Sequence, residues 1–311
     1  MDEQVCYGLP PDLQTSGPST VAKEYWHLPQ SVWGPIHAKA TGKGIVIANL
    51  DTGYNPNHPL IPKPLAARSF IPREAKVTDY HGHGSHTIGT CCGRSGLISP
   101  APEADLIVGK VLSKRGPSQA NSVPNGIRWA ADSGAHVISL SLGGDKPYKS
   151  MEDAIRYANS KGCVVVAAAG NAGYARRRNT INWPARYEGA LCIGSYSKDG
   201  SISGFSSGGR ELDLACPGSR IVSCNRTGSG LRTMSGTSMA TPFAAALCAL
   251  VLELIQKSGA RWPTGPTWWR EFIAANTEDR GATGKDVRWG YGVPRYTDII
   301  RKLSHGDLVW V

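Results

Sequence analysis

The sequence predicts an α/β domain built on a parallel sheet. Its apolar residues gather in short continuous runs, and amphipathic helical patterns stand between these runs. Continuous apolar runs are typical of strands covered on both faces, and strands that alternate with helices are typical of parallel sheets. Sites in such domains lie at the carboxyl ends of the strands, so we expect functional residues just after the runs. The predicted strands are 44–50, 106–112, 137–142, 163–168 and 191–194.

Three helices are predicted from the remaining patterns. Residues 125–133 place Ile127 and Ala130 on one face, and residues 150–161 form a second amphipathic segment that Gly162 ends. The third begins in the small-residue segment 235–242 and continues as an Ala-rich apolar stretch up to Gly259. Together with the strands, these helices supply both covering layers of a sheet.

Length and composition favour one large domain. The chain has 311 residues, of which 41% are apolar, and no linker-like stretch divides it. Its start lacks the basic and apolar pattern of a secretion signal, and no run reaches the length of a membrane span. We therefore expect a cytoplasmic protein without a membrane partner.

Charge and cysteine content exclude two further classes. The net charge is +10, but the basic residues are dispersed apart from Arg176, Arg177 and Arg178, and no aromatic residues alternate with them. We expect no nucleic-acid partner. The eight cysteines show no C-x2-C spacing and several lie in apolar runs, so we interpret them as reduced thiols.

A histidine-rich segment follows the first predicted strand. Asp51 ends that strand, and His81, His83 and His86 occur within six residues near Asp79. One interpretation is a zinc site, because His83 and His86 would share a helix face. The other is a general base, in which one histidine is oriented by a carboxylate and accepts a proton from a serine. The cluster alone favours neither.

Ser238 is the candidate nucleophile. It lies in the segment 235–242, where a glycine allows close approach of the backbone and a helix begins. Unpaired N–H groups and the positive end of the helix dipole would lie beside its hydroxyl. The same residue types are also ordinary helix caps, so the segment permits both interpretations.

Four segments, taken in order, resemble the motifs of the subtilisin-like serine proteases. An Asp, a His and a Ser follow one another at a strand end and at two helix starts, as in that family. The resemblance covers residues 32–296. The segments are Asp51-Thr52-Gly53, His83-Gly84-Ser85-His86, Ala168-Ala169-Gly170-Asn171 and 236–242.

The resemblance implies a three-layer fold with a mainly parallel sheet and a serine endopeptidase that forms an acyl-enzyme intermediate. Ser238 would attack the peptide carbonyl, His83 would accept the proton, and Asp51 would orient His83. Asn171 would donate to the oxyanion. Two alternatives stay open, a transpeptidase or macrocyclase on the same fold and a noncatalytic binding protein.

The resemblance also implies a protein or peptide substrate bound in extended form. Asn182 would close the far side of the specificity pocket, where subtilisin has glycine, so we expect a shallower or more polar pocket. The arginines at 176–178 lie in the same loop and either attract acidic residues of the substrate or belong to a solvated surface loop. The other pocket residues would be Ser141, Leu142, Gly143, Ala169 and Gly170.

No cofactor is required by this chemistry, and no metal ligands are assigned. Many relatives bind a structural Ca²⁺ in the loop after the histidine helix, but here the segment 91–102 offers little oxygen beyond Ser95 and Ser99. We therefore doubt calcium at that loop, although calcium elsewhere stays possible.

Residues 32–311 are the predicted catalytic domain, and residues 1–31 precede it as an extension. This layout is similar to that of intracellular subtilisins, whose short extensions block the active site. The proline-containing segment 7–11 could do the same here, since proline supplies no N–H and would misplace a scissile bond. A disordered tail is the alternative.

Overall fold

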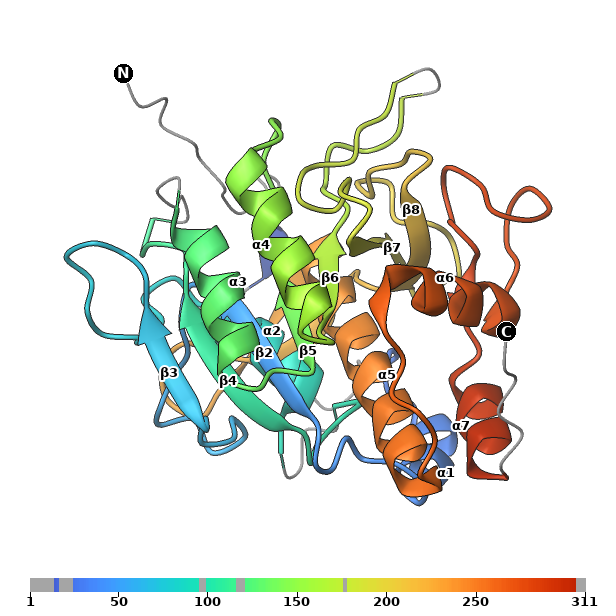
Figure 1. The fold of residues 1–311 in the computed structure, drawn as a ribbon, viewed down its shortest axis with the longest axis horizontal. Coiled ribbons are helices and arrows are strands. Elements are labelled where there is room, and N and C mark those ends of the chain that lie inside the picture. Colours follow the sequence, from blue (N-terminus) through green and yellow to red (C-terminus); the bar gives the residue numbers. More distant parts are fainter. Residues whose placement is uncertain (1–13, 17–24, 95–98, 116–120, 176–177, 306–311) are drawn as a thin grey trace.

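A seven-stranded parallel sheet forms the centre of the molecule in a computed structural model, which describes residues 14–16, 25–94, 99–115, 121–175 and 178–305 (Figure 1). The strand order is β3-β4-β2-β5-β6-β7-β8. All neighbours run parallel, which confirms the predicted fold class. The strands are β2 (Val46–Asp51), β3 (Ala66–Ser69), β4 (Asp105–Lys110), β5 (Val137–Leu140), β6 (Val164–Ala168), β7 (Ala190–Tyr196) and β8 (Leu212–Pro217).

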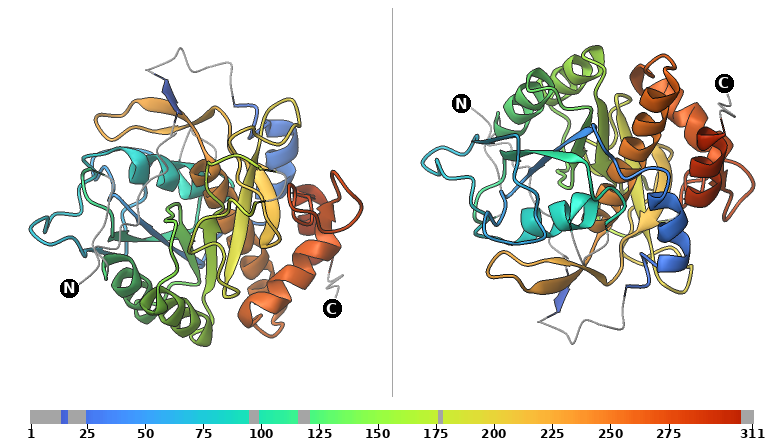
Figure 2. Two further views of the ribbon diagram at one scale, coloured as in Figure 1. Left: turned by 90° about the horizontal axis from the view of Figure 1, so that it is seen from above. Right: turned by 90° about the horizontal axis from the view of Figure 1, so that it is seen from below.

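Helices cover both faces of this sheet. Figure 2 shows α3 (Ser122–Asp132) and α4 (Lys149–Ser160) on one side, with α2 (His83–Cys92) and α5 (Thr237–Ser258) on the other. Successive residues of a strand point to opposite faces, so each strand contributes to two cores. Alternation along β2 and β4 sends Ile47, Leu106 and Val108 toward α2 and α5, and Ala48, Leu50 and Ile107 toward α3 and α4.

Helix α5 is the central helix of one core. It has 22 residues, and nearly all of them are buried, from Thr237 through Ile255. By length and composition it could cross a membrane, but its apolar window lies entirely inside the described fold. Gly259 ends it in the left-handed conformation, with a φ of 69°. The apolar stretch is therefore the core helix that the sequence indicates.

Smaller elements complete the described part of the chain. Strand β1 (Gln14–Ser16) joins a three-stranded antiparallel sheet in which Gln14 lies opposite Ser235. Closer to the core, Leu28 and His27 are buried, so residues before Val32 also pack on the domain. The remaining elements are α1 (Gln30–His37), β9 (Ile221–Cys224), β10 (Leu231–Ser235), α6 (Gly265–Asn276), β11 (Thr277–Glu278), β12 (Val293–Pro294) and α7 (Tyr296–Ser304).

Candidate active site

Asp51 and His83 form a buried pair where β2 ends and α2 begins. His83 Nδ1 lies 2.8 Å from both carboxylate oxygens of Asp51, and both side chains are at most 1% exposed. The backbone N–H of Thr52 also donates to Asp51 Oδ1, at 2.7 Å. A carboxylate only accepts hydrogen bonds, so Nδ1 carries the proton and the lone pair of the neutral ring is on Nε2.

Two glycines allow the helix and the strand to approach this closely. A Cβ on Gly84 would lie 2.1 Å from the carbonyl oxygen of Gly53, so no side chain fits there. Gly53 itself has a φ of 104°, which other residues rarely adopt. The glycines that follow Asp51 and His83 therefore set the spacing between the two functional side chains.

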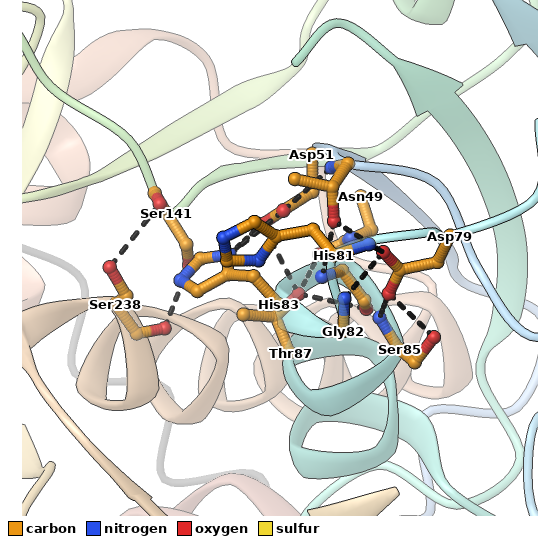
Figure 3. A network of polar contacts seen from close by, with 12 residues as sticks. Asn49, Asp51, Asp79, His81, Gly82, His83, Ser85, Thr87, Ser141 and Ser238 are labelled. Carbon is orange, nitrogen blue, oxygen red and sulfur yellow. Dashed lines mark hydrogen bonds and ion pairs between the residues drawn. The ribbon is translucent and has the colours of Figure 1, made fainter. Parts of the chain in front are cut away.

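Asp79 fixes the turn that leads into α2. Its buried carboxylate accepts five hydrogen bonds of 2.7–2.9 Å, and Figure 3 shows them converging on it. One donor is Thr52 Oγ1, which in turn accepts the N–H of Gly84. Asp79 thereby ties the loop after Asp51 to the start of the helix that carries His83. The other donors are His81 N, Gly82 N, Ser85 N and Ser85 Oγ.

Ser238 is the second residue of α5 and is fully buried. Its Oγ lies 3.3 Å from the carbonyl oxygen of Ser141, while Ser141 Oγ donates to the carbonyl oxygen of Ser238 at 2.8 Å. The imidazole of His83 lies between Asp51 and Ser238 (Figure 3). Its Nε2 is buried and has no hydrogen-bond partner among the described residues, so it is free to accept a proton.

Asn171 lies just beyond β6 and presents an unpaired amide. Its Oδ1 accepts both the N–H and the hydroxyl of Thr237, each at 2.9 Å, which fixes the amide plane beside Ser238. The opposite atom, Nδ2, is buried, and no described residue forms a hydrogen bond with it. A buried donor left unpaired is costly unless a ligand or reaction intermediate uses it.

The other two histidines of the cluster do not converge on a common point. His86 Nε2 lies 3.0 Å from the Ile221 carbonyl and 3.1 Å from that of Arg232, and burial lowers the pKa of His86 to about 3. Burial also lowers the pKa of His81, with the neighbouring His83 adding to the effect. Among the described residues, no group of three or more His, Cys, Asp or Glu side chains could hold a metal ion. The described histidines and carboxylates therefore do not form the common ligand set that the zinc interpretation requires.

The side chain of Asn182 crosses the predicted specificity pocket. A Cβ on Gly170 would lie 2.1 Å from Asn182 Oδ1, and one on Gly143 would lie 2.9 Å from Asn182 Cβ. Asn182 Nδ2 donates to Asp145 Oδ1 at 3.0 Å, and its backbone N–H donates to the carbonyl of Ala169 at 2.8 Å. Asn182 thus occupies the space between the two predicted walls.

Several predictions fall partly outside the described residues. Arg178 is described and exposed, whereas Arg176, Arg177, Ser95 and the segment 7–11 are not described. Ser99 is buried and its hydroxyl donates to the carbonyl of Gly93 at 3.1 Å. The seven described cysteines are free and buried, and they are Cys91, Cys92, Cys163, Cys192, Cys216, Cys224 and Cys248.

Comparison with known proteins agrees with this geometry. The family model described as "Subtilase family" matches residues 42–292. Thermitase of Thermoactinomyces vulgaris is 41% identical over 218 residues, which cover 68% of this chain and 76% of thermitase. Subtilisin Savinase of Lederbergia lenta is 38% identical over 216 residues, covering 68% and 78%. M-protease of Shouchella clausii is 38% identical over 238 residues, covering 73% of this chain and 61% of M-protease, so the match spans less than two thirds of that relative. The family match takes in every motif of the site, and the chain belongs to the subtilase family.

Proposed function

We propose that the chain is a serine endopeptidase that hydrolyses peptide bonds through an acyl-enzyme intermediate. One observation carries the proposal: within the described part of the chain, two buried nitrogens in the region of Ser238, His83 Nε2 and Asn171 Nδ2, lack hydrogen-bond partners. A proton acceptor and an oxyanion donor are the two groups that acyl transfer from a peptide demands of the residues around a serine. Relatives whose names describe proteases support the same activity.

In the proposed reaction, Ser238 Oγ turns from the carbonyl of Ser141 toward His83 and attacks the substrate carbonyl as Nε2 accepts its proton. Asp51 keeps Nδ1 protonated and stabilises the imidazolium. His83 then returns the proton to the leaving amine. Water attacks the acyl-enzyme with the same base, which regenerates Ser238.

Asn171 acts when negative charge develops on the carbonyl oxygen. Its Nδ2 and the backbone N–H of Ser238 donate to that oxygen, and the anchoring of Oδ1 by Thr237 means that the amide is already oriented. Removing the equivalent donor from subtilisin costs about 3 to 4 kcal/mol of transition-state stabilisation. We expect Asn171→Leu to lower kcat by a similar factor, about 10²- to 10³-fold.

The decisive test is Ser238→Ala together with labelling by a serine-directed phosphonate. The proposal requires loss of peptide hydrolysis in the variant and a single phosphonate adduct on Ser238 of the unmodified chain. Product masses separate the alternatives, because hydrolysis adds one water and transpeptidation adds an amine. A chain that binds peptide but neither cleaves it nor takes the label would be a noncatalytic binding protein.

We further propose that the substrate lies extended along Ser141, Leu142 and Gly143, beside Ala169 and Gly170. Because Asn182 fills part of the space between these segments, the pocket suits a small or polar residue before the scissile bond. Cleavage of a random peptide library tests this. A preference for large aromatic residues at that position would contradict it.

We propose that the N-terminal extension, residues 1–31, lowers activity. In support, Gln14 pairs with Ser235, only three residues before Ser238, so β1 begins close to the nucleophile. Comparing the full chain with one that starts at Gln14 isolates the first 13 residues while keeping β1 and the buried Leu28. Equal rates would contradict inhibition. A chain starting at Val32 then reports on the rest of the extension.

The proposed steps use only groups of the chain, so we propose that no cofactor is needed for catalysis. Activity should survive dialysis against EDTA, while a fall in Tm alone would reveal a structural cation. We also propose a cytoplasmic, reducing location, supported by the buried free thiols. Thiol titration of the denatured protein purified under argon should find the described cysteines unoxidised.

A further inference from the structure

A second cleft lies on the connection between β6 and β7, the segment that carries both Asn171 and Asn182. The cleft has a volume of about 340 Å³ and is bordered by Tyr174, Asn179, Arg186 and Arg210, with Arg178 at its edge. In Figure 1 this connection is the yellow-green loop that rises from the sheet. A cavity of this size accommodates one or two side chains of a bound peptide.

The charge of this cleft is positive and only partly compensated. Among the described residues, Glu211 is the one carboxylate paired with its arginines, at 3.3 Å from Arg210 Nε and 3.7 Å from Arg186 Nε. The longer of these contacts is an ion pair without a hydrogen bond, so the buried Arg186 Nε has no hydrogen-bond acceptor in the described part of the chain. Arg178 makes no ion pair with any described residue. Three arginines therefore face one carboxylate.

A fourth arginine, Arg288, adds to the positive charge near the cleft. The guanidinium of Arg288 lies over the ring of Tyr174, 5.0 Å from its centroid, and burial lowers the pKa of Arg288. Guanidinium groups bind carboxylates through paired hydrogen bonds, and desolvation strengthens the attraction. The cleft is thus suited to a carboxylate and unsuited to a cation.

The cleft is rigidly connected to the specificity pocket. Thr180 and Gly208 exchange two hydrogen bonds of 3.0 Å, and Asn179 Oδ1 accepts the N–H of Ile181 at 3.0 Å. Asn182 follows Arg178 by four positions, a span of at most about 14 Å when extended. A peptide whose residue enters the pocket can therefore reach the cleft with a side chain a few positions away.

We infer that the cleft is an exosite for acidic residues of the polypeptide substrate, which lie within about four positions of the scissile bond. This inference rests on the proposed protease function and adds a substrate class to it. The carboxylate of a Glu or Asp at the right position binds Arg178 and Arg210, whose side chains are exposed and accessible to a peptide. The gain is in binding, so it lowers KM and leaves kcat nearly unchanged.

The experiment is a scan of one peptide with Glu or Gln at each of the four positions on either side of the scissile bond. We expect one or two positions at which Glu lowers KM about 10-fold at low ionic strength, with the advantage decreasing as salt is added. The double variant Arg178→Gln/Arg210→Gln should lose this preference and cleave the Gln peptide as before. The matched control is Arg156→Gln/Arg301→Gln, which removes the same charge from α4 and α7.

A binding measurement separates this inference from the protease proposal. In the Ser238→Ala background, fluorescence anisotropy compares the Glu and Gln peptides directly. If the Ser238→Ala protein prefers the Glu peptide and the cleft variant loses this preference, the exosite is supported. This holds even if the unmodified chain cleaves no peptide, because absent cleavage contradicts only the protease proposal. Three results overturn the exosite: equal binding of both peptides, equal loss of preference in the control variant, or binding of free citrate without any advantage for Glu peptides.

Discussion

Replacing Asp79 should reduce catalysis as well as stability, because this carboxylate orients the start of α2. In Asp79→Ala the five donors that meet the carboxylate lose their acceptor, and Thr52 loses its bond to the turn before His83. Nothing else described in the structure connects Thr52 Oγ1 to that turn in the same way. The loop after Asp51 then keeps the bonds of Thr52 to the Gly84 N–H and to Lys110, and His83 keeps its contact with Asp51.

The magnitude follows from the number and kind of bonds. A hydrogen bond to a charged acceptor contributes about 1.5 to 3 kcal/mol, and water replaces part of it at the partly exposed backbone of His81. We therefore expect Asp79→Ala to lower the free energy of unfolding by about 3 to 5 kcal/mol. In Asp79→Asn the amide oxygen still accepts hydrogen bonds, but the amide NH₂ faces the N–H of Ser85. About half of the loss in unfolding free energy should therefore remain.

The catalytic effect is separated from the stability effect by a matched control. Glu253 is also buried and accepts three backbone N–H groups, from Thr41, Gly42 and Lys43, but at the opposite end of α5. Urea unfolding should show similar losses in Asp79→Ala and Glu253→Ala. Phosphonate titration then counts the active molecules, and kcat per active molecule should fall about 10- to 100-fold only in Asp79→Ala. If kcat stays within twofold in both variants, Asp79 does not position His83.

Three further predictions concern other parts of the fold. Arg270 donates to the buried carboxylate of Asp213 at 3.0 Å, and Lys285 pairs with the same carboxylate at 3.1 Å, so Arg270→Met should lower the free energy of unfolding by about 2 kcal/mol in urea. Asn182→Gly should deepen the specificity pocket and raise kcat/KM about 10-fold for peptides with an aromatic residue before the scissile bond. Burial lowers the pKa of His27 to about 3, so the folded chain favours the neutral ring. The contribution of His27 to the free energy of unfolding is therefore fully present above about pH 6.5 and is lost as the pH falls toward 3, because the unfolded chain binds the proton first. Urea midpoints at pH 8 and pH 5 should show a loss of roughly 2 kcal/mol from this histidine, which His27→Leu abolishes.

The sequence reveals the elements whose signal is local. The strands β2, β4, β5, β6 and β7 are continuous apolar runs, and all five were predicted within a few residues of their observed bounds. The apolar pattern does not predict strand β8, because Asp213 interrupts the run, although the carboxylate of Asp213 is buried. Its partner Arg270 lies 57 residues away on α6, and only the folded chain brings the two together.

The same distinction applies within the site. Asp51, His83, Ser238 and Asn171 stand in motifs that are contiguous in sequence, so their types and neighbours were enough to select them. In the sequence Asp79 stands out only as a neighbour of the histidine cluster, because nothing local shows that its carboxylate meets the hydroxyl of Thr52, 27 positions earlier. A carboxylate followed closely by Gly and Ser at a predicted helix start is the signal that sequence reasoning could have used.

The strand order explains why the orienting contacts concentrate around the loop after Asp51. Strands β2, β5 and β6 are neighbours in the sheet, so the residues that follow them meet at one edge. On its other side β2 pairs with β4, whose last residue, Lys110, is fully buried opposite Asp51. Lys110 Nζ donates to the carbonyl of Thr52 at 2.7 Å and lies 3.4 Å from Glu74. The residue after Asp51 is thus held by Asp79 through its side chain and by Lys110 through its backbone. Two buried charges outside the motifs, of opposite sign, therefore fix the loop on which the orientation of His83 depends.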